Sequence, residues 1–126
     1  MCATVCIVDD DEGMREVLAQ VVRKAGLTSE LYDSAEAFLQ RPDCSDIDCL
    51  LLDLHLDGMS GLALLARLSR GEPPFPVFLI SAAHDADTAS RARQLGASVV
   101  DKPFDTRILS QRILAAIGSD RQAPAS

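Results

Sequence analysis

Three aspartates that follow apolar runs of the sequence have the chemistry to bind a divalent cation. Asp9 and Asp10 come directly after Thr4–Val8, and Asp53 comes directly after Leu50–Leu52. A carboxylate at the edge of a buried core is costly unless a partner compensates its charge, and neighbouring carboxylates raise one another's pKa. Magnesium takes oxygen ligands of this kind. If the two runs are neighbouring strands, these aspartates therefore form a Mg²⁺ site.

A hydroxyl and a lysine follow two further apolar runs. Ser81 comes directly after Val77–Ile80, and Lys102 comes shortly after Ser98–Val100. Taken alone, each has an ordinary explanation, as a loop hydroxyl that satisfies an amide or as a solvated surface lysine. Together with the aspartates they supply a nucleophile, metal ligands, a cation and a hydroxyl. This combination predicts metal-assisted phosphoryl transfer with Asp53 as the acceptor.

The two acids after the first aspartate pair have a structural explanation instead. Asp11 and Glu12 stand where a helix begins, so we expect them to cap it and to complement its positive end. The segment holds acids where a nucleotide-binding loop would hold glycines, which argues against a phosphate-cradling loop.

Short apolar runs alternate with helical patterns along the chain, and this alternation predicts the fold. Nearly continuous apolar strands are typical of a parallel sheet with helices on both faces. We therefore predict a doubly wound α/β domain, in which a site forms at the carboxyl ends of the strands. The predicted strands are Thr4–Val8, Thr28–Tyr32, Cys49–Leu52, Val77–Ile80 and Ser98–Val100.

Five helices are predicted between and after these strands. In the first, apolar residues recur at helical spacing from Met14 to Ala25, and Gly26 follows as a C-terminal glycine. Ser34 and Asp105 stand where N-caps belong. The other predicted helices are Ala35–Leu39, Gly61–Leu68, Asp85–Leu95 and Thr106–Ile117.

Length and composition restrict the classes of function. The chain has 126 residues, and we predict one domain over residues 1–118 followed by a flexible tail or linker over 119–126. Its net charge of -7 argues against direct nucleic-acid binding. The cysteines lack the spacing and histidines of a zinc site. No apolar run approaches the ~18–20 residues of a membrane span, and no signal-peptide pattern is present, so we expect a cytoplasmic protein without membrane association.

The motifs that carry this chemistry resemble, in order and spacing, those of the receiver domain of bacterial two-component response regulators. The resemblance covers Ala3 to Gly118. The segment Ser34–Leu39 is further similar to receivers of the FixJ type, which usually precede a helix-turn-helix DNA-binding domain. The matching motifs are Val8–Glu12, Leu51–Leu54, Met59–Gly61, Ile80–Ala82 and Lys102–Phe104.

The resemblance implies a role for each residue of the predicted site. Asp53 corresponds to the phosphoacceptor, which takes a phosphoryl group from a phosphohistidine of a sensor histidine kinase. Asp10 corresponds to the direct Mg²⁺ ligand beside Asp53 and the backbone carbonyl of His55, with Asp9 acting through water. Lys102 corresponds to the lysine that pairs with the phosphoryl oxygens.

Further implications concern the switch and the output. Ser81 corresponds to the switch hydroxyl, the amide of Ala82 is expected to face the phosphate, and a cis bond is expected before Pro103. The implied fold is flavodoxin-like with strand order 2-1-3-4-5. The domain is expected to be a regulatory phosphoacceptor that assists its own phosphorylation and dephosphorylation, rather than an enzyme. It would regulate transcription through an effector domain and dimerise through the face of Asp85–Leu95, Ser98–Val100 and Thr106–Ile117.

Several positions depart from the family's pattern. His55 stands beside the acceptor, where it is expected to influence the lifetime of the phosphate. Asp57 replaces the usual proline, so the loop should be more mobile. Val99 stands where many receivers have an aromatic switch residue. The helix Asp85–Leu95 has alanines in place of larger apolar residues, and we predict that it is loosely held.

Three alternatives to a receiver with a separate effector domain remain open. The chain is also compatible with a single-domain regulator and with a scaffold that keeps the fold without phosphorylation. A Mg²⁺-dependent phosphohydrolase fits least well, because such enzymes commonly need a second acid where this chain has His55, and because the chain is too short for their cap domain.

Overall fold

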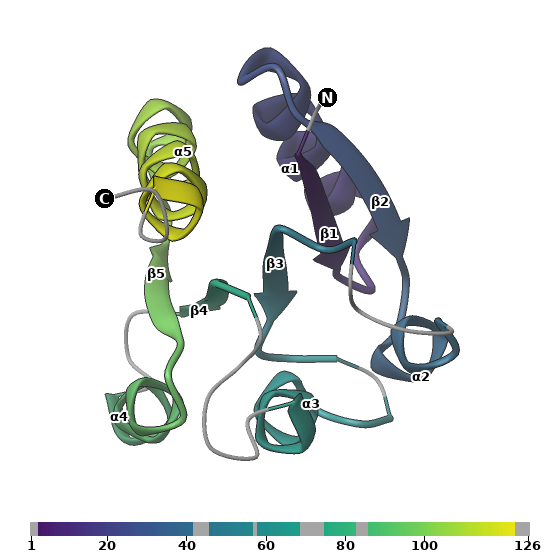
Figure 1. The fold of residues 1–126 in the computed structure, drawn as a ribbon. Coiled ribbons are helices and arrows are strands. Elements are labelled where there is room, and N and C mark those ends of the chain that lie inside the picture. Colours follow the sequence, from purple (N-terminus) through teal and green to yellow (C-terminus); the bar gives the residue numbers. More distant parts are fainter. Residues whose placement is uncertain (1–2, 42–45, 57, 69–74, 83–85, 123–126) are drawn as a thin grey trace.

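Five parallel strands form one sheet at the centre of the molecule (Figure 1). The structure is a computed structural model that describes residues 3–41, 46–56, 58–68, 75–82 and 86–122. The strand order is β2-β1-β3-β4-β5, which confirms the predicted doubly wound fold. The strands are β1 (Thr4–Val8), β2 (Thr28–Tyr32), β3 (Cys49–Asp53), β4 (Val77–Ala82) and β5 (Ser98–Lys102).

Helices cover both faces of the sheet, as Figure 1 shows, with α1 and α5 on one face and α2, α3 and α4 on the other. Parallel strands need crossover connections, and helices supply them here. The helices are α1 (Glu12–Lys24), α2 (Ala35–Leu39), α3 (Gly61–Leu68), α4 (Ala86–Gln94) and α5 (Thr106–Gln122).

The central strand β3 is buried along its whole length. Successive side chains of a strand point to opposite faces, so Cys49 and Leu51 enter the core beneath α1 and α5. Leu50 and Leu52 enter the core beneath α2, α3 and α4. Because both faces of β3 are covered, the run is apolar throughout. Asp53 is the last residue of the strand and therefore lies at the edge of the sheet.

The predicted helix caps are present. Asp11 Oδ1 accepts a hydrogen bond from the Gly13 amide at 2.9 Å, and Ser34 Oγ accepts one from the Ala37 amide at 3.0 Å. Asp105 Oδ1 accepts from the amide of Arg107 at 2.8 Å. These side chains satisfy amides that the first turns of α1, α2 and α5 leave without intrahelical partners.

Three strands run further than their apolar residues predicted. β3 continues to Asp53, β4 to Ala82 and β5 to Lys102. The ladders explain the difference, because Asp53 pairs with Ile80 and Ala82 pairs with Lys102. Backbone pairing with a neighbour holds these polar ends in strand geometry, although their side chains give no apolar signal.

The helix α5 also runs further than predicted. It continues to Gln122, whereas the sequence placed its end at Ile117 and a flexible tail or linker over 119–126. A single glycine costs a helix only about 1 kcal/mol, and the stronger helix breaker, Pro124, comes later. The rest of the predicted tail, residues 123–126, and Asp85 of the predicted fourth helix lie outside the described residues. Among the described residues, no helix combines the length and apolar character needed to cross a membrane.

Candidate functional site

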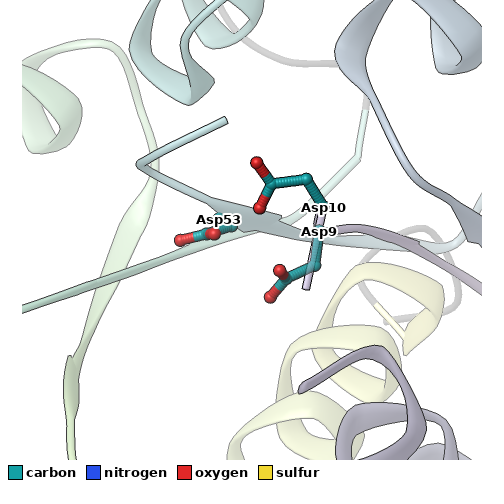
Figure 2. Close-up of side chains that lie close together, drawn as sticks. All are labelled: Asp9, Asp10 and Asp53. Atoms are coloured by element: carbon teal, nitrogen blue, oxygen red, sulfur yellow. The ribbon is translucent and has the colours of Figure 1, made fainter. Parts of the chain in front are cut away.

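Three carboxylates converge at the carboxyl edge of the sheet (Figure 2). Asp9 and Asp10 follow β1, and Asp53 is the last residue of β3. The two strands are neighbours, with Val8 paired to Leu52, so the three side chains reach the same point. One carboxylate oxygen of each lies within 4.8 Å of the others. Asp9 and Asp53 are buried and Asp10 is exposed, so the cluster opens to solvent on one side.

Asp9 carries the clearest electrostatic signature of the cluster. Burial raises the pKa of Asp9 to about 6, the hydrogen bond from the Asp11 amide opposes this, and the charge of Asp53 adds to the increase. Its Oδ2 atom is buried and accepts no hydrogen bond from the described residues. A buried carboxylate oxygen without a partner beside two further carboxylates provides a place for a cation.

The donor set fits Mg²⁺. Every ligand atom that the cluster offers is a carboxylate oxygen, and hard divalent cations prefer such oxygens. The exposed side of the cluster leaves room for the water molecules that Mg²⁺ retains. A cation here would also counter the burial and the charge of Asp53, which together raise the pKa of Asp9.

The carboxylate of Asp53 is held from two directions. The amide of His55 donates to Asp53 Oδ1 at 3.3 Å. The ammonium of Lys102, at the end of β5, lies 3.6 Å from the same oxygen. A buried carboxylate paired with one lysine stays in a defined place at the edge of the sheet and remains available as a nucleophile.

Ser81, one residue before the end of β4, and Lys102, the last residue of β5, lie at this same edge. Ser81 is almost completely buried and pairs with Asp101, one residue beyond the pair of Ile80 with Asp53. The next pair joins Ala82 to Lys102, and the peptide bond before Pro103 is cis, as the resemblance implies. The topology thus brings together the residues predicted from four separate strand ends.

Two residues that position the site were not predicted from the sequence. Arg15 of α1 donates from its guanidinium to the backbone oxygen of Asp9 at 2.7 Å and fixes the turn after β1. The sequence offered one clue to this role. A cation is disfavoured by the helix dipole near the N-terminus of a helix, so an arginine there needs a specific partner. Gly61 passes so close to the backbone of Asp53 that a Cβ at this position would collide with the backbone oxygen of Asp53.

Of the positions that depart from the family pattern, the structure describes His55 and Val99. The side chain of His55 is exposed at the rim of the site. Val99 is half-buried and packs against the core beneath α2, α3 and α4. Asp57 lies outside the described residues, as does the side chain of Ala82.

Comparison with known proteins identifies one family. Residues 5–114 match the response regulator receiver domain. The chain is 33% identical over 112 residues to the transcriptional regulatory protein FixJ of Bradyrhizobium diazoefficiens, covering 88% of this chain and 55% of FixJ. It is 38% identical over 102 residues to the DNA-binding transcriptional regulator NtrC of Escherichia coli, covering 80% of this chain and 22% of NtrC.

Solved structures agree with this result. The crystal structure of full-length FixJ from B. japonicum superimposes with a TM-score of 0.87 at 31% identity, covering 98% of this chain and 61% of that chain. The receiver domain of NtrX from Brucella abortus gives 0.83 at 27% identity, covering 91% of this chain and 98% of that chain. The chain therefore spans about half of FixJ and a smaller share of NtrC.

Proposed function

The chain belongs to the response regulator receiver family of two-component systems, and we propose that it accepts a phosphoryl group on Asp53 in a Mg²⁺-dependent reaction. One observation carries this proposal. Asp53 is a buried carboxylate that lies within 4.8 Å of the carboxylate oxygens of Asp9 and Asp10 and 3.6 Å from the ammonium of Lys102. This arrangement joins a nucleophile, metal ligands and a cation at one point.

The metal ligands are assigned from the resemblance to the receiver family, and the cluster of Asp9, Asp10 and Asp53 supports the assignment. Asp10, Asp53 and the backbone carbonyl of His55 would bind Mg²⁺ directly, and Asp9 would act through a bound water molecule. When bound, Mg²⁺ neutralises negative charge on the phosphoryl oxygens and on the carboxylates. The amide of His55 already donates a hydrogen bond to Asp53, which orients the carboxylate before the phosphoryl donor binds.

The chemical step is a displacement at phosphorus. A carboxylate oxygen of Asp53 attacks the phosphorus of a phosphohistidine on a sensor histidine kinase. The O–P bond forms as the N–P bond breaks, and the imidazole nitrogen keeps the electron pair and takes up a proton. Lys102 pairs with the phosphoryl oxygens, and the hydroxyl of Ser81 and the amide of Ala82 complete their contacts.

The phosphoryl group changes the charge at a buried point, and this change is the signal. It adds roughly 1.5–2 negative charges, which Mg²⁺ and Lys102 would compensate and which the hydroxyl of Ser81 would stabilise by a hydrogen bond. Receiver domains are regulatory rather than conventional enzymes. We propose that this one assists its own phosphorylation and dephosphorylation, and that it acts in the cytoplasm.

The output is proposed from the relatives. FixJ and NtrC are transcriptional regulators, and this chain matches only part of each. We therefore propose that phosphorylation of Asp53 controls transcription through an effector domain, with dimerisation through the face formed by α4, β5 and α5.

Intact-mass measurement with acetyl phosphate and Mg²⁺ tests the acceptor directly. We expect a gain of one phosphoryl group that depends on Mg²⁺ and is absent from Asp53→Asn. Asp33→Asn, an exposed aspartate after β2, is the matched control and should be phosphorylated like the parent. Phosphorylation of Asp53→Asn to the level of the parent would refute Asp53 as the acceptor. If the parent gains no mass, a beryllofluoride titration that also detects no binding would favour the scaffold.

A further inference from the structure

A glutamate outside the carboxylate cluster contacts the loop that connects β3 to α3. Glu36 lies in α2, and its Oε2 atom accepts a hydrogen bond from the amide of Met59 at 3.0 Å. The same oxygen would lie 2.8 Å from a Cβ placed on Gly58. Gly58 has a positive φ of 80°, so its backbone turns toward the glutamate without a side chain in between. Glu36 thus accepts a hydrogen bond from Met59 and occupies the space that a side chain at Gly58 would need.

This loop begins beside the site. His55 follows Asp53 and Leu54 directly, and its amide donates to the acceptor carboxylate. At the other end, the amide of Gly61 donates to the backbone oxygen of Leu54 at 3.0 Å and closes the base of the loop. Ser60 caps α3 through a hydrogen bond from the Ala63 amide at 3.1 Å. The loop is therefore fixed at its base, and Glu36 holds its outer part.

The helix that carries Glu36 is itself firmly placed. Ser34 caps its first turn, and the buried ring of Phe38 packs edge-on against Tyr32, with ring centroids 5.5 Å apart. Arg41, just after the helix, forms hydrogen bonds with Glu30 and with the hydroxyl of Tyr32. A hydrogen bond from such an anchored helix restricts the loop more than one from a mobile segment would.

We propose that Glu36 is a positioning residue of the phosphorylation site, which holds the β3–α3 loop at Met59 so that the backbone carbonyl of His55 faces the metal position. This inference rests on the proposed function, because it assigns a purpose to the loop geometry at that site. Glu36 touches neither the metal nor the phosphoryl group. It acts through the amide of Met59, and it requires a side chain of the right length with an oxygen acceptor.

Three substitutions separate reach from charge. Glu36→Gln keeps the length and an oxygen acceptor but loses the charge, whereas Glu36→Asp keeps the charge and loses the reach. Glu36→Ala loses both. Glu16→Gln, an exposed glutamate on α1, controls for the loss of one negative charge.

Two readouts without a phosphoryl donor are amide hydrogen exchange at Met59 by NMR and Mg²⁺ affinity by calorimetry. We expect Glu36→Ala and Glu36→Asp to speed exchange at Met59 and to weaken Mg²⁺ binding, each about 2- to 10-fold, the range of one hydrogen bond. Glu36→Gln and Glu16→Gln should match the parent. Unchanged protection of Leu51 in β3 would show that each variant is folded.

Three results would overturn the proposal. Parent-like exchange at Met59 in Glu36→Ala would show that Glu36 does not protect the Met59 amide. Faster exchange at Met59 with unchanged Mg²⁺ affinity would show that the hydrogen bond exists but does not position the metal site. A pattern in which Glu36→Asp matches the parent and Glu36→Gln does not would assign the effect to charge. None of these readouts uses phosphorylation. Failure of the proposed function would therefore appear separately, in the intact-mass measurement, as a parent that binds Mg²⁺ but does not gain a phosphoryl group.

Discussion

The two edges of the sheet are held by different kinds of contact. At the β2 edge, the ring of Phe38 packs against Tyr32, and Arg41 joins Glu30, Tyr32 and Asp46 by hydrogen bonds. At the β5 edge, the buried residues of α4 are Ala89 and Ala92. An aromatic ring buries far more apolar area than a methyl group does. The β5 edge should therefore open locally at a lower free-energy cost.

This difference coincides with a division inside the proposed site. Asp10, which would bind the metal directly, and Asp9, which would act through water, follow β1, the neighbour of the well-held strand β2. Ser81 and Lys102, which would contact the phosphoryl group, lie near the ends of β4 and β5 on the weakly held side. In the proposed function, metal ligands therefore lie on the firmly held side of the sheet. The residues that contact the phosphoryl group lie on the weakly held side. We therefore expect the response to phosphorylation in α4 and β5.

The largest predicted effect concerns the ring at the β2 edge. Phe38 is buried, so Phe38→Ala should lower the free energy of unfolding by about 3–5 kcal/mol, measured by urea denaturation. Ala92→Gly, in the middle of α4, should cost only about 1 kcal/mol. Similar losses from both substitutions would contradict the difference between the edges.

A pH effect follows from the raised pKa of Asp9. Its folded-state pKa of about 6 lies above the ordinary aspartate pKa of 3.8, so the protonated acid is favoured on folding. Its stabilising contribution is complete below pH 3.8 and is lost as the pH rises through 6. In metal-free buffer at pH 7, Asp9→Asn should therefore unfold with a free energy about 2–3 kcal/mol higher than that of the parent.

Thermal and urea unfolding at several pH values check this effect. Asp33→Asn, an exposed aspartate, should follow the parent at every pH. Saturating Mg²⁺ should narrow the gap between Asp9→Asn and the parent at pH 7, because a cation stabilises the charged carboxylate. An Asp9→Asn variant that is less stable than the parent at pH 7 without metal would show that the charged Asp9 carboxylate does not destabilise the folded protein.

The charged network at the β2 edge should contribute less than the ring. Arg41→Met keeps the length of the side chain but removes its hydrogen bonds, and Tyr32 still donates to Glu30 at 2.9 Å. We expect a loss of about 1–2 kcal/mol in urea denaturation. Arg91→Met, exposed on α4, should stay within about 0.5 kcal/mol of the parent. A larger loss from Arg91→Met than from Arg41→Met would reverse the comparison.

The sequence predicted the elements that periodicity and caps define, and it missed contacts that only the folded chain creates. Buried β3 and the caps Ser34 and Asp105 were predicted because each has a local signal. Glu36 and Met59 are 23 residues apart and meet through a loop, and no pattern reports such a pair. The site residues lie on four strand ends, so motif order predicted the set, while the distances between them depended on strand pairing.

The smallest predicted effect is the response to phosphorylation, and it tests the comparison most directly. In Mg²⁺ and acetyl phosphate, amide exchange should change by about fivefold or more in α4 and β5, the lower end of typical coupling. It should stay nearly constant in β2 and α2. Lys102→Ala should still gain phosphate on Asp53 but lose most of the change in α4, because the ion pair that links β5 to the acceptor is gone. Equal changes at both edges, or a Lys102→Ala variant that responds like the parent, would show that the phosphate does not act through the weakly held side.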